Sequence, residues 1–393
     1  MRKICIVTST RADYSIFKPL IMRLYEDANI DLSIIATGMH LCPEFGGTYS
    51  EIEADGFKIN KKIDIQLSSD APSAMSKTMG IAMISFSDYF RENMPDILFV
   101  LGDRYEIVAV CCAATNQRIP IAHIHGGETT EGAIDECYRH SITKMSALHF
   151  TSCETYRNRV IQLGEQPERV FNVGALGVEN ILTASLMSIE SLEQDLGFNL
   201  SDKPYGVVTF HPVTLEDSTG ISQTNELLRA LDSIANMRFI ITKANADAGG
   251  REINKLLDDY CKSRNNCHLV ASLGMIRYLS AVKHASVIIG NSSSGILEGP
   301  ALKVPTVNIG DRQKGRIMAD SVLCCPPEAT MIVDAIKRAL SQEFQMLTQN
   351  VVSPYGDGNV SYRIVCALKR VLEEGLSVKK VFYDCIYTNS NKE

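Results

Sequence analysis

The sequence predicts an α/β protein of two Rossmann-like domains that face a central cleft. Short apolar runs alternate with longer stretches of helical periodicity, a pattern typical of parallel sheets covered by helices. Polar or glycine-containing loops follow most of the apolar runs, at the strand ends where open α/β sheets bind ligands. A chain of 393 residues is long enough for two such domains.

The first predicted domain covers residues 1–185. Apolar runs predict its strands at residues 4–8, 32–36, 57–63, 95–101, 119–124 and 170–173. Helical spacing predicts helices at 15–27, 73–94 and 154–163, two more opening after residue 104 and near residue 133, and a linker helix at 178–186. In the helix at 73–94, Met75, Met79, Met83 and Ile84 recur at helical spacing, which indicates a core or a dimer interface. We therefore expect a homo-oligomer, a dimer or a tetramer.

The second predicted domain covers residues 186–358. Its strands are predicted at 205–211, 238–242, 267–271, 285–289, 305–309 and 322–325. Its helices are predicted at 225–235, 252–261, 275–281, 296–302 and 329–340. Residues 359–393 form a last helix, at 359–374, and a tail, which we expect to pack back on the first domain.

The composition is that of an ordinary globular protein, with 45% hydrophobic and 22% charged residues. A formal net charge of −7 without long basic runs argues against nucleic acid or a membrane surface as a partner. No apolar run is long enough to span a bilayer, and the N-terminal one is too short for a signal peptide. The twelve cysteines include no C-x-x-C motif, so we expect reduced structural thiols in a cytoplasmic protein.

The stretch from Gly290 to Arg316 is the strongest candidate binding element. An apolar strand is followed by Gly-Asn-Ser-Ser-Ser-Gly and then by an apolar-periodic helix. The unpaired N–H groups at the start of such a helix, with the hydroxyls of Ser292 and Ser293, predict an anion site that suits phosphate. The alternative is that these serines only cap the helix. Arg312 follows the next strand and adds a cation that can bind phosphate.

Other polar side chains stand at predicted strand ends or helix starts: Arg11, Asp103, Arg104, Asp135, His211 and Asn245. Arg11, in a strand-to-helix loop, is better placed for phosphate contact than for a surface charge alone. Asp103 and Asp135 are either helix caps or carboxylates for acid–base work. Asp135 also stands one helical turn before Arg139 and can pair with it.

A His-x-His-Gly-Gly-Glu run ends the strand predicted at 119–124. His123 and His125 would face the same side of a strand and suggest a metal site, but no third ligand is evident and we expect no metal. The two glycines allow the backbone to approach a ligand closely. Glu128 completes the run.

Taken together, these loops resemble the hydrolysing UDP-N-acetylglucosamine 2-epimerases of bacterial sialic-acid biosynthesis, within a superfamily of GT-B-like fold. The resemblance extends along nearly the whole chain. The segments that carry it, in order, are Thr10-Arg-Ala-Asp-Tyr14, Thr37-Gly-Met-His40, Gly102-Asp-Arg104, His123-Ile-His-Gly-Gly-Glu128, Asp135-Glu with Arg139-His-Ser-Ile-Thr-Lys144, His211-Pro212, Gly290-Asn-Ser-Ser-Ser-Gly295 with Glu298, and Gly310-Asp-Arg-Gln-Lys-Gly-Arg316.

The resemblance implies elimination of UDP from C1 with loss of the C2 proton, followed by hydration of the resulting glycal with inversion at C2. It implies the sugar and catalytic loops in the first domain, UDP binding in the second, and no cofactor. The candidate acid–base residues are Asp103, Asp135 and His211. The candidate nucleotide or substrate contacts are Arg11, Ser15, Arg104, Asn245, Ser292, Ser293, Glu298 and Arg312, with Glu298 on the ribose hydroxyls.

One position departs from the family. Many relatives have a glutamate where this chain has His125, and that glutamate is a catalytic candidate in them. Here its role passes to His125, passes to Glu128, or is dispensed with. We therefore add both residues to the catalytic candidates.

Three alternatives remain at the level of sequence. UDP-N,N'-diacetylbacillosamine 2-epimerases of legionaminic-acid synthesis look very similar and differ in the sugar. A GT-B glycosyltransferase would share the fold and the nucleotide site but needs an acceptor. A regulatory nucleotide-sugar-binding module would not turn over. Release of UDP without an acceptor separates the epimerases from the other two.

Overall fold

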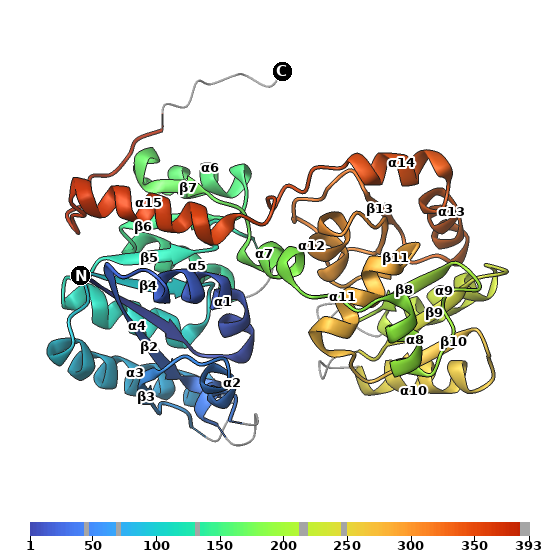
Figure 1. Cartoon of the computed structure of the whole chain (residues 1–393), viewed down its shortest axis with the longest axis horizontal. Coiled ribbons are helices and arrows are strands. Elements are labelled where there is room, and N and C mark those ends of the chain that lie inside the picture. Colours follow the sequence, from blue (N-terminus) through green and yellow to red (C-terminus); the bar gives the residue numbers. More distant parts are fainter. Residues whose placement is uncertain (43–46, 68–71, 130–133, 212–218, 245–249, 386–393) are drawn as a thin grey trace. The chain divides into compact units, whose positions relative to one another are not determined.

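The structure is a computed structural model that describes residues 1–42, 47–67, 72–129, 134–211, 219–244 and 250–385. The chain divides into two compact units (Figure 1). Unit 1 comprises Met1–Asn180 and Tyr355–Glu393, and unit 2 comprises Ile181–Pro354. The chain passes from unit 1 to unit 2 within helix α7 (Leu176–Thr183), a few residues before the predicted domain end at 185.

Unit 1 is built on a seven-stranded sheet in the order β3-β2-β1-β4-β5-β6-β7, with every neighbouring pair parallel. Its strands are β1 (Arg2–Thr8), β2 (Ile30–Thr37), β3 (Ile59–Ile63), β4 (Ile97–Leu101), β5 (Ile121–Ile124), β6 (Leu148–Thr151) and β7 (Val170–Asn172). The central strands β4 and β5 are buried along their whole length because helices cover both faces of a parallel sheet. The carboxyl ends of β1, β4 and β5 therefore lie along one edge, where the predicted site residues follow them.

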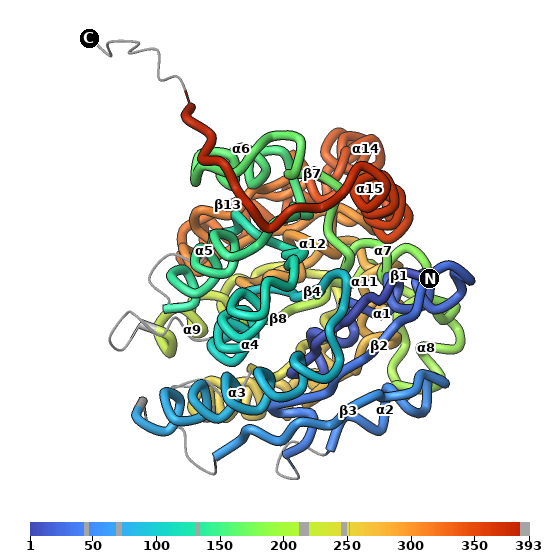
Figure 2. The backbone as a smooth tube through the Cα atoms, turned by 90° about the vertical axis from the view of Figure 1, so that its left-hand side faces the viewer, coloured from blue at the N-terminus to red at the C-terminus, as the bar shows by residue number. Residues whose placement is uncertain are grey.

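The helices of unit 1 are α1 (Arg11–Tyr25), α2 (Tyr49–Ala54), α3 (Pro72–Glu92), α4 (Tyr105–Asn116), α5 (Asp135–Met145), α6 (Glu154–Gln162), α7 and α15 (Val360–Glu374), with short 3₁₀ turns η1 (Gly38–Leu41) and η3 (Pro167–Arg169). Helix α15 packs on α1, and its Ile364 and Leu368 are fully buried in the same core as Leu24. After α15 the chain, red in Figure 2, runs back beside α6. Its Lys380 binds the buried Glu165 and the carbonyl of Ser146, which ties the C-terminal segment to unit 1.

Unit 2 is built on a six-stranded parallel sheet in the order β10-β9-β8-β11-β12-β13. Its strands are β8 (Tyr205–Thr209), β9 (Arg238–Thr242), β10 (Cys267–Val270), β11 (Val287–Gly290), β12 (Thr306–Ile309) and β13 (Val322–Cys325). Its helices are α8 (Ile189–Leu196), α9 (Thr219–Asp232), α10 (Gly250–Lys262), α11 (Gly274–His284), α12 (Ser294–Ala301), α13 (Ala329–Ala339) and α14 (Gln342–Asn350).

The predicted strands and the predicted parallel pairing are confirmed, but several helix predictions were incomplete. The short helices α2, α8 and α14 were not predicted. Helix α1 begins at Arg11 rather than near Ser15, because the Thr10 hydroxyl accepts a hydrogen bond from the Asp13 N–H and caps the helix there. Helix α9 likewise begins at Thr219, six positions before the predicted start at 225.

The methionine-rich helix α3 is only partly buried. Met79 packs against the core, whereas Met83 and Ile84 are exposed. All twelve cysteines are free thiols. Within the described ranges, no helix combines the length and the apolar character needed to cross a bilayer.

Candidate functional site

Two groups of candidate residues emerge, one in each unit. The first, which we call the unit 1 cluster, consists of Asp103, His125, Glu128, Asp135 and Arg139. It is built at the carboxyl ends of β4 and β5 and at the start of α5. The second, which we call the unit 2 pocket, is a cavity of ≈ 340 Å³ at the carboxyl ends of β8, β9 and β10 and the starts of α11 and α12.

Asp103 in the unit 1 cluster pairs with Arg139, for which the sequence had suggested a different partner. The Arg139 guanidinium donates to Asp103 Oδ2 and lies 3.8 Å from Glu136. The predicted partner of Arg139 was Asp135, one helical turn away. The structure instead brings in Asp103 from a loop 36 positions earlier in the chain. Asp103 does not cap α4, whose N-cap is Arg104 without a side-chain hydrogen bond.

The charges around Asp103 act against each other. Burial raises the pKa of Asp103 above its usual value, and the carboxylates of Asp135 and Glu128 add to the rise. The Arg139 guanidinium opposes it. A carboxyl group whose pKa is raised accepts a proton more readily than an ordinary carboxylate, which favours a role in acid–base catalysis.

His125 and Glu128 form the second part of the unit 1 cluster. His125 Nδ1 lies 3.7 Å from Glu128 Oε1, and that same oxygen accepts a 2.7 Å hydrogen bond from Ser152. Both nitrogens of His123, by contrast, are used within the core, at 2.8 Å from the Gly102 carbonyl and 3.2 Å from the Thr143 hydroxyl. His123 is therefore a buried structural residue and does not share a ligand with His125.

Within the described residues, no group of three histidine, cysteine, aspartate or glutamate side chains is arranged to hold a metal ion. His40 is also structural, since its two nitrogens bind the hydroxyls of Thr8 at 3.0 Å and Thr48 at 2.9 Å. Burial lowers the pKa of His40 to about 4.

The remaining candidates of unit 1 lie near the same sheet edge. Arg11 is the first residue of α1, whereas the sequence predicted it in a loop. Its side chain is exposed and forms an ion pair with Glu51 at 2.9 Å. Ser15 lies in α1, and its carbonyl accepts a hydrogen bond from Asn180. Arg104 donates to the buried Glu106 at 2.5 Å. The structure thus places these three residues without testing a role in binding.

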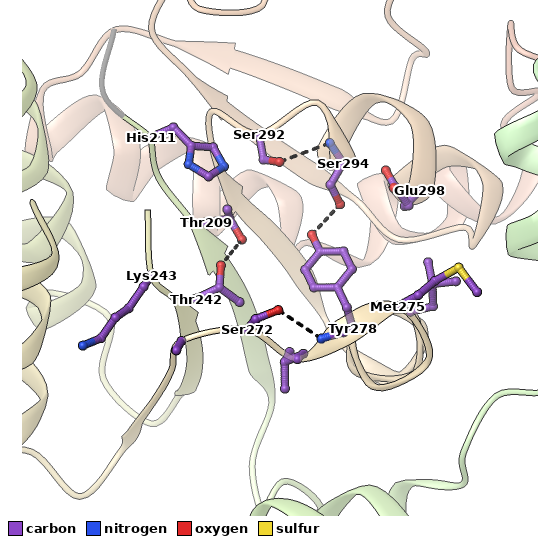
Figure 3. Close-up of a pocket in the computed structure, with 14 residues that line it drawn as sticks. Thr209, His211, Thr242, Lys243, Ser272, Met275, Tyr278, Ser292, Ser294 and Glu298 are labelled. Atoms are coloured by element: carbon purple, nitrogen blue, oxygen red, sulfur yellow. Dashed lines mark hydrogen bonds between the residues drawn. The ribbon is translucent and has the colours of Figure 1, made fainter. Parts of the chain in front are cut away.

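The unit 2 pocket is lined by hydroxyl groups, by apolar side chains such as Met275, and by the charged residues Lys243 and Glu298 (Figure 3). The hydroxyls of Thr209 and Thr242 pair at 2.7 Å, and the Tyr278 hydroxyl binds that of Ser294. Figure 3 shows His211 beside Ser292 at the end of β8. Of the predicted candidates, His211, Ser292 and Glu298 line this pocket.

Glu298 is the one carboxylate of the described pocket lining. Its Oε2 atom is buried and has no hydrogen-bond partner within the described residues. Burial raises its pKa, and its charge helps to raise the pKa of Tyr278 to about 12. A buried carboxylate oxygen without a donor is costly in the free protein, so a ligand with hydroxyl donors would satisfy it.

The predicted turn between β11 and α12 depends on one glycine. Gly290 has φ +137°, and a Cβ at this position would overlap the backbone carbonyl of Thr209 on the neighbouring strand. Ser293 is the N-cap of α12 but makes no side-chain cap hydrogen bond, whereas the Ser292 hydroxyl accepts from the Ser294 N–H at 3.3 Å. Capping therefore accounts for Ser292 only in part and for Ser293 not at all.

Arg312 lies next to this turn. Its guanidinium donates to the Asn291 carbonyl at 3.1 Å, as does the side chain of the buried Gln313 at 2.9 Å. The Asn291 side chain in turn bridges the backbone N–H and C=O of His211, at 2.7 Å and 2.8 Å. These bonds join the ends of β8, β11 and β12 into one rigid edge.

Sequence reasoning missed several residues of these groups and one candidate cannot be placed. Asn245 lies outside the described residues. The residues missed are Arg139 as the partner of Asp103, and Ser152, Tyr278, Asn291 and Gln313. Asn291 and Gln313 carried a signal, because both stand inside the predicted binding stretch Gly290 to Arg316, and Arg139 begins one of the segments that carry the resemblance. Ser152 and Tyr278 are brought in from distant elements.

Comparison with known proteins agrees with the resemblance seen in the sequence. Residues 22–369 match the family described as UDP-N-acetylglucosamine 2-epimerase. A Campylobacter jejuni protein named GDP/UDP-N,N'-diacetylbacillosamine 2-epimerase (hydrolyzing) is 44% identical over 345 residues, which is 88% of this chain and 89% of that protein. Polysialic acid biosynthesis protein P7 of Escherichia coli is 42% identical over 385 residues, 98% of each chain.

Solved structures show the same fold. The Neisseria meningitidis UDP-GlcNAc 2-epimerase, bound to UDP-GlcNAc, matches with a TM-score of 0.77 at 20% identity, over 94% of this chain and 100% of that one. This likeness confirms the predicted α/β class with two Rossmann-like domains of GT-B-like type. Given the family match over most of its length, the chain belongs to the UDP-N-acetylglucosamine 2-epimerase family.

Proposed function

We propose that this protein is a hydrolysing UDP-N-acetylglucosamine 2-epimerase, which converts UDP-N-acetylglucosamine and water into UDP and N-acetylmannosamine. The observation that carries the proposal is the buried, unpartnered Glu298 oxygen in a hydroxyl-lined pocket at the strand ends of unit 2. The family match and the name of the Escherichia coli relative support it. The product would supply sialic-acid synthesis for a surface polysaccharide.

The proposal assigns the nucleotide to the unit 2 pocket. Glu298 Oε2 would accept hydrogen bonds from the ribose hydroxyls, which supply the donors that it lacks. Ser292, Ser293 and the N-terminus of α12 would bind the diphosphate, where the helix dipole favours an anion. Arg312, Arg11, Arg104 and Asn245 remain proposed contacts of the nucleotide or the sugar.

The proposal assigns proton transfer to the unit 1 cluster, with His211 of unit 2 as a further candidate. In the first step, the C1–O bond breaks and its electron pair leaves with UDP, while C2 loses its proton and a C1=C2 double bond forms. In the second step, the oxygen of water bonds to C1, and a proton returns to C2 on the opposite face. Asp103 and Asp135 would stabilise positive charge at C1 and exchange protons.

This chemistry needs no redox cofactor. Elimination and hydration together cleave one C–O bond, form another and exchange protons, without net oxidation or reduction of the sugar. The negative charge that develops on the leaving diphosphate can be stabilised by hydrogen-bond donors and cations of the protein. We therefore propose that the reaction proceeds without a cofactor or a metal ion.

A second candidate is the same reaction on UDP-N,N'-diacetylbacillosamine. The name of the Campylobacter jejuni relative, at 44% identity, favours it. The two sugars differ at C4 and C6, and the nucleotide contacts proposed above are the same for both.

A product assay separates the candidates. The purified protein is given each UDP-sugar in D2O with a chelator, and the products are followed by NMR. Release of UDP with deuterium at C2 of N-acetylmannosamine is the expected result. Activity on the diacetylated sugar alone would change the proposed substrate to UDP-N,N'-diacetylbacillosamine and leave the proposed reaction unchanged. No release of UDP from either sugar would contradict the epimerase proposal and lead to a test with glycosyl acceptors.

A further inference from the structure

His125 combines two unusual features. It follows β5 directly and has φ +64°, a left-handed backbone conformation that is uncommon for residues other than glycine. Its Nε2 atom is buried and has no hydrogen-bond partner within the described residues. Backbone strain and an unsatisfied buried nitrogen each lower the stability of the folded protein. Residues with such features cluster at functional sites.

The other ring nitrogen determines which proton His125 carries. Nδ1 lies 3.7 Å from Glu128 Oε1, too far for a direct hydrogen bond but close enough for the carboxylate charge to favour a proton on Nδ1. With Nδ1 protonated, the neutral ring presents the lone pair of Nε2. That nitrogen is then a base without a partner.

Glu128 is itself held in place. Ser152 donates to Glu128 Oε1 at 2.7 Å from the end of β6. Arg159 binds the carbonyl of Gly127 at 2.6 Å and the hydroxyl of Thr129, so both sides of Glu128 are anchored to α6. Gly127, at φ +78°, packs so closely on the Tyr156 carbonyl that a Cβ there would overlap it.

The groups facing His125 are the Glu128 and Asp103 carboxylates, the Arg139 guanidinium and the His123 imidazole. Burial lowers the pKa of His125, Arg139 adds to the effect, and the two carboxylates oppose it. The net direction is downward from 6.5, so the imidazole is neutral at pH 7.

We propose, resting on the function proposed above, that His125 Nε2 is the base that removes the C2 proton, with Glu128 and Ser152 as positioning residues. The C2–H electron pair forms the C1=C2 bond, the C1–O pair leaves with UDP, and the proton is held on Nε2 until water takes it. Asp103 is less suited to this step because Arg139 engages its Oδ2. Its raised pKa suits the acid that returns a proton to the opposite face of C2.

The test uses the full-length protein and the variant His125→Gly. Glycine adopts the left-handed backbone freely, so the fold should be kept, and thermal unfolding checks this. We expect kcat to fall about 10²-fold or more with KM changed little, and added imidazole to restore part of it. The control is His284→Gln on α11, whose imidazole binds the Met187 carbonyl outside the two candidate groups, and it should keep wild-type kcat.

A second readout covers the case in which imidazole cannot enter. The Glu128 carboxylate raises the pKa of His125, so Glu128→Gln should lower that pKa. The acidic limb of the pH profile of kcat/KM should then move to lower pH. A purely structural role for Glu128 would leave that limb in place. The inference is overturned if His125→Gly keeps kcat within about threefold, or if its loss is not rescued and the Glu128→Gln limb does not move. If the wild type releases no UDP from either sugar, the proposed function fails as well.

Discussion

The two units carry opposite kinds of candidate site. The unit 2 pocket is lined mainly by hydroxyls and apolar side chains, with Lys243 and Glu298 as its charged residues, and its hydroxyl hydrogen bonds are formed within the free protein. The unit 1 cluster is made of carboxylates, an arginine and a histidine, and its charges shift the pKa values of Asp103 and His125. Preformed neutral donors suit recognition, whereas coupled ionisable groups suit proton transfer. Substitutions should therefore change affinity in unit 2 and turnover in unit 1.

The largest effect is expected at Asp103. Asp103→Asn removes the charge that pairs with Arg139 and a group that can exchange a proton, so formation of free sugar should fall about 10²- to 10⁴-fold. The affinity for UDP should stay within about threefold, because the nucleotide is assigned to unit 2. Isothermal titration with UDP and a product assay measure the two quantities. The matched control is Asp88→Asn on the exposed side of α3. Wild-type turnover in Asp103→Asn would show that Asp103 takes no part in the mechanism.

The reverse pattern is expected at Glu298. Glu298→Gln weakens hydrogen bonds to the ribose, and we expect the Kd for UDP to rise about 10- to 100-fold, as for bonds to a charged group. Because the free protein no longer buries an unpaired carboxylate, its Tm should not fall. Unchanged UDP affinity would show that Glu298 does not contact the nucleotide. Glu190→Gln, on the exposed surface of α8, is the control.

Acid should destabilise unit 1 first. Burial lowers the pKa of His40 to about 4 and that of His123 to about 3, so the folded protein binds fewer protons than the unfolded chain below pH 6.5. Stability therefore falls as the pH drops from 6.5, by about 2 kcal/mol per histidine at pH 5. Among the histidines in the described part of unit 2, only His268 has a lowered pKa. Hydrogen exchange should show loss of protection in unit 1 before unit 2.

Asp13 and Asp103 oppose this loss of stability in acid, because burial raises their pKa values. The folded protein therefore binds more protons at these two residues than the unfolded chain, so their contribution to stability decreases as the pH rises. The variant His40→Gln isolates the histidine contribution. Its stability should depend less on pH between 6.5 and 5, by about 2 kcal/mol, as measured by urea unfolding at both values. An unchanged pH dependence would mean that His40 titrates normally.

The smallest effect is expected at Tyr278. Tyr278→Phe removes the hydroxyl that binds Ser294 at the start of α12 and leaves the ring in the pocket. One neutral hydrogen bond contributes about 1 kcal/mol, so the Kd for UDP should rise about fivefold and kcat should stay unchanged. A fall in kcat without a change in affinity would break the division between the two units.

The sequence by itself determined the fold class and indicated the candidate site residues along the chain. Buried strands such as β4 and β11 are continuous apolar runs, and the glycine and serines that follow β11 stand next to one another, so a local pattern reveals them. The short helices α2, α8 and α14 were not predicted because few residues carry their periodicity. Helix α1 begins earlier than predicted because Thr10 caps it. Local signals therefore predicted strands better than helix limits.

The partners of the functional groups were decided only by the tertiary structure. Asp103 meets Arg139, Glu128 meets Ser152, and Tyr278 meets Ser294 across 36, 24 and 16 positions of sequence. Each pair joins residues of different elements, which meet near the carboxyl edge of a parallel sheet. No spacing rule in the sequence encodes such meetings, because the intervening helix and strand lengths, not the residues themselves, set which side chains arrive together.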